Sequence, residues 1–77
     1  MKGFEFTWNR NVLSQRENQL VGALLQMHMM YVVLYRKVGD GRTETSLEDA
    51  SGAINFTVRW GREMFPDLGI GHRLAHG

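Results

Sequence analysis

The chain has 77 residues, of which 43% are hydrophobic and 22% charged, and its formal net charge is +1. This composition excludes a disordered chain, and the near-neutral charge excludes attraction to nucleic acid or acidic lipid along the whole length. The absence of cysteine excludes disulfide bonds and thiolate metal sites. A domain this small buries only about 60% of its unfolded surface, so we expect added stability from self-association or a larger partner.

The N-terminal segment, residues 2–11, is predicted to form an extended arm. Phe4, Phe6 and Trp8 alternate with polar residues, which is the period of a β-strand with one apolar face. A lone strand leaves its backbone groups unpaired, so we expect a second copy of the chain to pair with it. The segment lacks the apolar core of a signal peptide, and we expect a cytoplasmic protein.

The first predicted helix covers residues 14–38. Ser14 followed by Glu17 fits a capping box, and Gly39 after two cations is typical of a helix end. On a helical wheel the apolar residues cover a wide arc of roughly 220°. The arc contains Leu20, Ala23, Leu24, Met27, His28, Met30, Tyr31, Leu34, Tyr35 and Val38, with Val21, Leu25 and Val32 at its margin.

The opposite side of this helix is polar, except for a strip that recurs about every four residues. The strip consists of Gly22, Gln26, Met29 and Val33. An exposed apolar strip on a polar face is typical of a contact with another protein, whereas methionines also commonly fill cores. We predict that these four positions bind a partner, with core packing as the alternative.

Two other structures compete for this stretch of sequence. Residues 29–38 are rich in β-branched and aromatic side chains, so a strand there and a turn at Asp40-Gly41 would give an α+β fold of order β-α-β-β-α. A membrane span is the weaker alternative, because Gln26 and His28 fall at the midpoint of the uncharged stretch.

The second predicted helix covers residues 46–65 and follows a loop over residues 39–45. Ser46 and Asp49 resemble a capping box, and Pro66 ends the helix. Its apolar arc is narrower, roughly 160°, and contains a seam of small residues: Ala50, Ala53, Thr57 and Gly61. Small residues let another helix approach, so we expect bulky side chains of the first helix to fill this small-residue seam in an antiparallel hairpin.

The predicted fold is therefore mainly α, with an arm, a helical hairpin and a glycine-rich loose tail over residues 66–77, all in one domain. The apolar arc of the first helix is wider than one neighbouring helix covers. We therefore predict a homo-oligomer in which two hairpins form a four-helix core.

No set of side chains in the sequence points to catalysis. Ser14, Glu17 and Asp49 are explained as helix caps, and no nucleophile, base and orienting group can be assembled. His72 and His76 have the spacing of two metal ligands on a helix, but glycines surround them and no third ligand is near. We predict a protein that is not an enzyme and uses no cofactor or metal.

The predicted function is protein binding, as a small regulator, adaptor or inhibitor that docks on a larger protein. An inhibitor encoded by a virus or plasmid is one concrete version of this role. The alternative is a dimeric DNA-binding regulator, because strand–helix–helix is also the order of elements in ribbon–helix–helix repressors. That alternative needs clustered cations, and the candidate basic patch is Arg10, Arg16, Arg36, Lys37 and Arg42.

Overall fold

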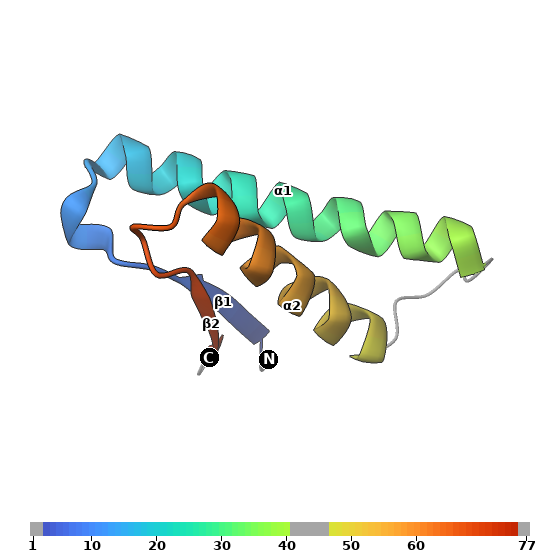
Figure 1. The fold of residues 1–77 in the computed structure, drawn as a ribbon. Coiled ribbons are helices and arrows are strands. Elements are labelled where there is room, and N and C mark those ends of the chain that lie inside the picture. Colours follow the sequence, from blue (N-terminus) through green and yellow to red (C-terminus); the bar gives the residue numbers. More distant parts are fainter. Residues whose placement is uncertain (1–2, 41–46, 76–77) are drawn as a thin grey trace.

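The computed structural model describes residues 3–40 and 47–75. Its elements in chain order are strand β1 (Gly3–Thr7), 3₁₀ helix η1 (Arg10–Val12), helix α1 (Gln15–Asp40), helix α2 (Leu47–Met64) and strand β2 (Gly71–Ala75). The two helices lie side by side, and the two strands form a small antiparallel sheet in which Gly3 lies opposite Ala75 (Figure 1). The protein is thus mostly helical, with a two-stranded sheet.

Both predicted helices are confirmed, with ends that differ by one or two residues. The capping box at the start of α1 is present: the Ser14 N–H donates to Glu17 Oε1 at 3.0 Å, and the Glu17 N–H donates to Ser14 Oγ at 3.2 Å. Because α1 continues through Asp40, Gly39 does not end it, and residues 30–38 are helical. The β-α-β-β-α alternative is therefore wrong.

Strand β2 corrects the prediction of a loose tail over residues 66–77. It pairs antiparallel with β1, so that Phe6 lies opposite His72 and Glu5 lies opposite Arg73, with which it forms an ion pair. The strand that we expected a second chain to complete therefore finds its partner in its own C-terminal segment. Sequence inspection missed this pairing because the two strands lie at opposite ends of the chain.

The segment between α2 and β2 is held against the rest of the chain by backbone contacts. Gly69 has a φ of +61°, in the left-handed region that favours glycine. On either side of it, the Asn9 N–H donates to the Leu68 carbonyl at 2.8 Å, and Arg62 Nε donates to the Ile70 carbonyl at 2.8 Å. These bonds place Leu68 and Ile70 under α1, where both are buried.

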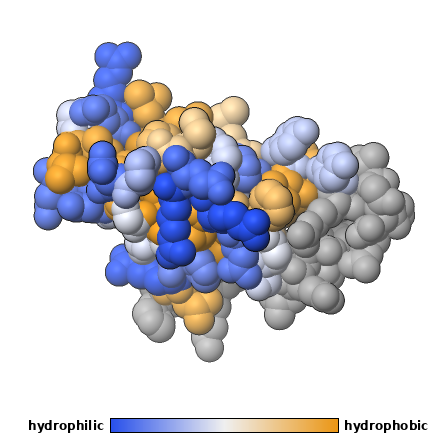
Figure 2. Space-filling model, viewed as in Figure 1, coloured by the Kyte–Doolittle hydropathy of each residue, from blue (hydrophilic) through white to orange (hydrophobic). Residues whose placement is uncertain are grey.

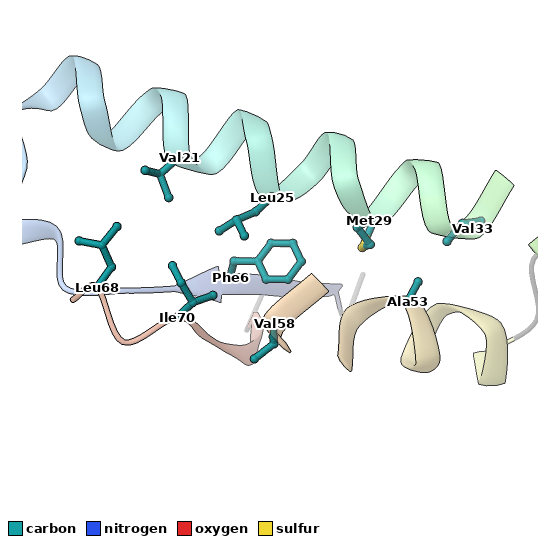
Figure 3. Packing of buried hydrophobic residues seen from close by; sticks show 9 residues of the cluster. All are labelled: Phe6, Val21, Leu25, Met29, Val33, Ala53, Val58, Leu68 and Ile70. Atoms are coloured by element: carbon teal, nitrogen blue, oxygen red, sulfur yellow. The ribbon is translucent and has the colours of Figure 1, made fainter. Parts of the chain in front are cut away.

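The core lies between α1, α2 and the sheet (Figure 3). At its centre, Leu25 and Thr57 are fully buried. A Cβ on Gly61 would lie 2.9 Å from Ile70 Cγ2 and 3.0 Å from Leu25 Cδ2, so only glycine permits this approach. The apolar core residues are Phe6, Val21, Leu25, Met29, Val33, Ala53, Val58, Leu68 and Ile70.

Ala53, Thr57 and Gly61 of the small-residue seam are buried as predicted, whereas the side chain of Ala50 lies outside the described part. The face of α1 that packs there differs from the predicted one. Val21, Leu25, Met29 and Val33 point toward α2 and the sheet (Figure 3), whereas Leu20, Leu24, Leu34 and both tyrosines, which were expected there, are exposed. Two polar contacts fix this rotation of α1. Trp8 Nε1 donates to Asn18 Oδ1 at 2.9 Å, and His28 Nδ1 shares a hydrogen bond of 2.9 Å with the Thr57 hydroxyl.

Candidate interaction surface

The side of α1 that faces away from the core carries a continuous set of large apolar side chains. Each is between 44% and 72% exposed, whereas the apolar core residues are at most 8% exposed. We call this set the exposed α1 face: Leu20, Leu24, Met27, Met30, Tyr31, Leu34 and Tyr35. Hydrophobic atoms are visible along the upper edge of the molecule, over α1 (Figure 2). No Asp, Glu, Lys or Arg occurs between positions 18 and 35, so this surface carries no formal charge at neutral pH.

Five members of the exposed α1 face follow one another at alternating intervals of four and three residues. This heptad row consists of Leu20, Leu24, Met27, Tyr31 and Leu34. The four-three alternation keeps side chains on one narrow line of a helix, and it is the spacing at which two helices interlock in a coiled coil. The heptad row therefore has the geometry of a helix–helix contact, and its side chains are exposed in the part of the chain that the structure describes.

A ridge of two aromatic rings stands at the C-terminal end of the exposed α1 face. The rings of Tyr31 and Tyr35 are stacked, with centroids 6.5 Å apart and an interplanar angle of 23°. Their exposures of 68% and 72% are among the largest of the apolar residues of α1. A stacked aromatic pair of this kind presents a rigid surface that loses little conformational entropy on binding.

A groove of about 600 Å³ lies at the other end of the exposed α1 face, where the start of α1 meets the end of α2. Leu20 and Leu24 belong to both features, so groove and face are continuous. Its carboxylates come from Glu17 and Asp67. We call it the terminal groove, and its lining is Val12, Leu13, Glu17, Leu20, Val21, Leu24, Met64, Phe65, Pro66, Asp67 and Leu68.

Glu17 gives the terminal groove a fixed negative charge. Hydrogen bonds from the backbone and hydroxyl of Ser14 lower the pKa of Glu17 below its usual value of 4.5. The carboxylate is therefore ionised at neutral pH, and the capping box holds it in one place. A ligand for this groove combines an apolar body with a polar or positive edge.

His28 lies at the edge of the core, outside this surface. Its ring stacks on Trp60, with centroids 4.4 Å apart and an interplanar angle of 10°. Partial burial lowers the pKa of His28, because the charged imidazolium loses hydration. The residue is thus a structural contact between α1 and α2 that favours the neutral ring.

The predicted partner-binding strip does not form an exposed surface. Met29 and Val33 are buried in the core, which favours the core-packing alternative at these two positions. Gln26 is exposed, and Gly22 is half-buried beneath Trp8, whose Cη2 would lie 3.4 Å from a Cβ at that position. The four-three spacing of the heptad row is present in the sequence, but it does not by itself mark that face of α1 as exposed.

The described positions of the candidate basic patch are spread over both ends of α1. Arg16 and Arg36 are twenty residues apart on the same helix, which corresponds to about 30 Å at the rise of an α-helix. Arg10 and Arg16 are near the start of α1, Lys37 is near its end, and Arg42 is outside the described residues. The guanidinium of Arg10 lies 4.0 Å above the Trp8 ring. Strand β1 also pairs within its own chain, unlike the first strand of a ribbon–helix–helix dimer.

Among residues 3–40 and 47–75, no three His, Asp or Glu side chains are placed so that they could hold a metal ion. Within the same residues, neither helix combines the length and the apolar character that a membrane crossing requires. No protein-family model, no curated protein and no solved structure matches the chain.

Proposed function

We propose that this chain is a non-enzymatic protein-interaction module that self-associates and docks on a larger protein as a small regulator, adaptor or inhibitor. The exposed α1 face is its binding surface. The observation that carries this proposal is that α1 is apolar on two sides, and only one of them is covered by α2 and the sheet.

The size of the exposed α1 face supports this proposal. Its seven side chains offer on the order of 700 Å² of surface, which exceeds the contiguous apolar patch of a few hundred Å² that is usual for monomers. Burying a single Leu or Met side chain contributes about 1.5–3 kcal/mol. Because these side chains form one continuous surface, a single binding partner can bury several of them together.

Several side chains that could serve in catalysis are instead engaged in contacts that stabilise the fold, which supports a non-enzymatic role. The Ser14 hydroxyl and the Glu17 carboxylate cap α1, and the Thr57 hydroxyl is bonded to His28 inside the core. Glu5 forms an ion pair with Arg73 across the sheet. Each of these groups stabilises the fold, and none of them points into the terminal groove except Glu17.

The proposal is tested with two exposed apolar residues on different helices. Tyr31 on α1 is 68% exposed, and Phe56 on α2 is 51% exposed. We expect Tyr31→Glu to abolish the capture of a partner from extracts of the native host, because a charge then sits in the binding surface. Phe56→Glu is the matched control and retains the partner. Capture is quantified by mass spectrometry, and circular dichroism verifies that both variants keep their helices.

Two outcomes contradict the proposal. A partner that binds the wild type and Tyr31→Glu equally does not use the exposed α1 face. A partner that is lost with Phe56→Glu but kept with Tyr31→Glu binds through α2 instead.

A further inference from the structure

Resting on the proposed role of the exposed α1 face, we propose that a second copy of this chain covers that face when no larger partner is bound. The two α1 helices lie antiparallel, related by a two-fold axis that passes near Met27. Each Tyr31–Tyr35 ridge then fills the terminal groove of the other copy.

The heptad row is symmetric about Met27 to within one residue. Leu20 and Leu34 lie seven residues before and after it, and Leu24 and Tyr31 lie three and four residues away. In an antiparallel pair centred on Met27, Leu20 therefore faces Leu34 of the second copy, and Leu24 faces Tyr31 of the second copy. Every large side chain of the row meets another large side chain, as interlocking helices require.

The ridge and the terminal groove lie on the same flank of α1. Glu17 in the groove and Tyr35 on the ridge are eighteen residues apart, which is five complete helical turns, so they project in the same direction. In an antiparallel pair, the two-fold axis is perpendicular to both helices. The same flank of each helix then faces the same side of the dimer, although the two helices run in opposite directions. The Tyr35 ring of one copy is thereby brought over the groove of the other. In a parallel pair, ridge would meet ridge and both grooves would stay empty.

Charge also favours the antiparallel pair. The dipoles of two antiparallel helices oppose each other, which places the positive end of one beside the negative end of the other. The carboxylates of Glu17 and Asp67 border the terminal groove. Tyr31 and Tyr35 each carry a phenolic O–H donor for these acceptors.

The area is sufficient for a specific dimer. The exposed α1 face offers on the order of 700 Å² for each copy, against about 800 Å² per partner in a standard interface. The apolar lining of the terminal groove adds to that area. The proposed interface is formed by α1 and the terminal groove, and β1 pairs with β2 within its own chain.

This dimer has a consequence for the docking of a larger protein. The same side chains serve both contacts, so self-association and docking compete. The apparent affinity for the larger protein falls in proportion to the fraction of chains that are free of the dimer.

The absence of cysteine permits a direct test, because a single introduced thiol reports one contact. We expect Met27→Cys to form a disulfide-linked dimer under mild oxidation. Leu20→Cys and Leu34→Cys each form little on their own, but a mixture of the two forms the crossed dimer. Phe56→Cys, on the exposed side of α2, is the control for random encounters. Circular dichroism of each variant confirms that the helices are retained.

Light scattering over a concentration series supplies the second measurement. We expect a mass that rises to twice the chain mass, and an increase of about tenfold or more in the dimer dissociation constant for Tyr35→Ala.

A mass that stays at one chain up to high micromolar concentration overturns the dimer. Leu20→Cys linking efficiently to itself overturns the antiparallel arrangement, and a dimer in which Met27→Cys links no better than Phe56→Cys uses another surface. A monomer that still loses its partner with Tyr31→Glu overturns self-association alone and leaves the proposed docking on a larger protein standing.

Discussion

The two sides of α1 have similar chemistry and opposite environments. One side presents Val21, Leu25, Met29 and Val33, which are at most 8% exposed. The other presents the exposed α1 face, which is equally apolar and contains larger side chains. Hydrophobicity alone therefore does not decide which side of this helix is buried.

What separates the two sides is the shape of the neighbouring elements. The small-residue seam of α2 leaves room for Leu25 and for Ile70, which meet at Gly61. The aromatic rings of Tyr31 and Tyr35 are too large for such a narrow space, since helix packing depends on the side chains at the contact. Both tyrosines lie on the exposed side, whereas leucine and methionine occur on both sides of α1.

The largest expected effect comes from two methionines that lie two positions apart, one on each side of α1. Met29 is 8% exposed and Met27 is 68% exposed. We expect Met29→Glu to unfold the chain, because burying a carboxylate costs several kcal/mol, which is comparable to the whole stability of a small domain. Met27→Glu changes the stability of the single chain by no more than about 0.5 kcal/mol and removes self-association. Urea denaturation followed by circular dichroism, at low chain concentration, measures both effects.

Equal loss of helicity in the two methionine variants would show that both sides of α1 are structural. Retained helicity in both would show that Met29 does not lie in a closed core. Either result contradicts the assignment of the two faces.

An effect of intermediate size is expected at Gly61, where α2 approaches the side chains of Leu25 and Ile70 most closely. A Cβ at Gly61 would lie within 3.0 Å of two core side chains, whereas a Cβ at Gly22 would make an ordinary contact of 3.4 Å with Trp8. We expect Gly61→Ala to destabilise the fold by about 1–3 kcal/mol through overpacking. Gly22→Ala is the matched control and is neutral or stabilising by up to about 1 kcal/mol, because alanine favours the helix. Thermal and urea unfolding test the pair, and a stabilised Gly61→Ala variant would contradict the packing.

The smallest expected effect is a dependence of stability on pH that arises from His28 at the edge of the core. Burial lowers the pKa of His28 below 6.5, so the unfolded chain binds a proton more readily than the folded one. We therefore expect full stability above about pH 7 and a loss of stability as the pH falls from 6.5 through the lowered pKa of His28. The loss is smaller than the effect of Gly61→Ala, because the ring is only partly buried.

Urea midpoints between pH 7.5 and pH 5 measure this loss. His28→Gln removes the dependence, while His72→Gln, on the exposed part of β2, retains it. A dependence that persists in His28→Gln assigns the titration to another group.

Much of the local structure follows from the sequence. The 3.6-residue period, the Ser14–Glu17 capping box and Pro66 define two helices to within one or two residues, because these signals act between neighbours in the chain. The sequence also predicts which face of α2 is buried, because its apolar arc is narrow and includes the small-residue seam. For the candidate surface, the sequence contains the heptad row but does not mark it as exposed.

Tertiary structure alone decided the rest. The pairing of β1 with β2 joins residues 3–7 to residues 71–75, and no local pattern specifies a contact over that separation. The rotation of α1 was also undetermined, because an apolar arc of roughly 220° is compatible with several orientations. The seam of α2, the position of Ile70 and the hydrogen bonds of His28 and Trp8 select one of them. That choice buries Met29 and Val33 and leaves the leucines and tyrosines on the surface, because packing complementarity, and not hydrophobicity, distinguishes the two sides.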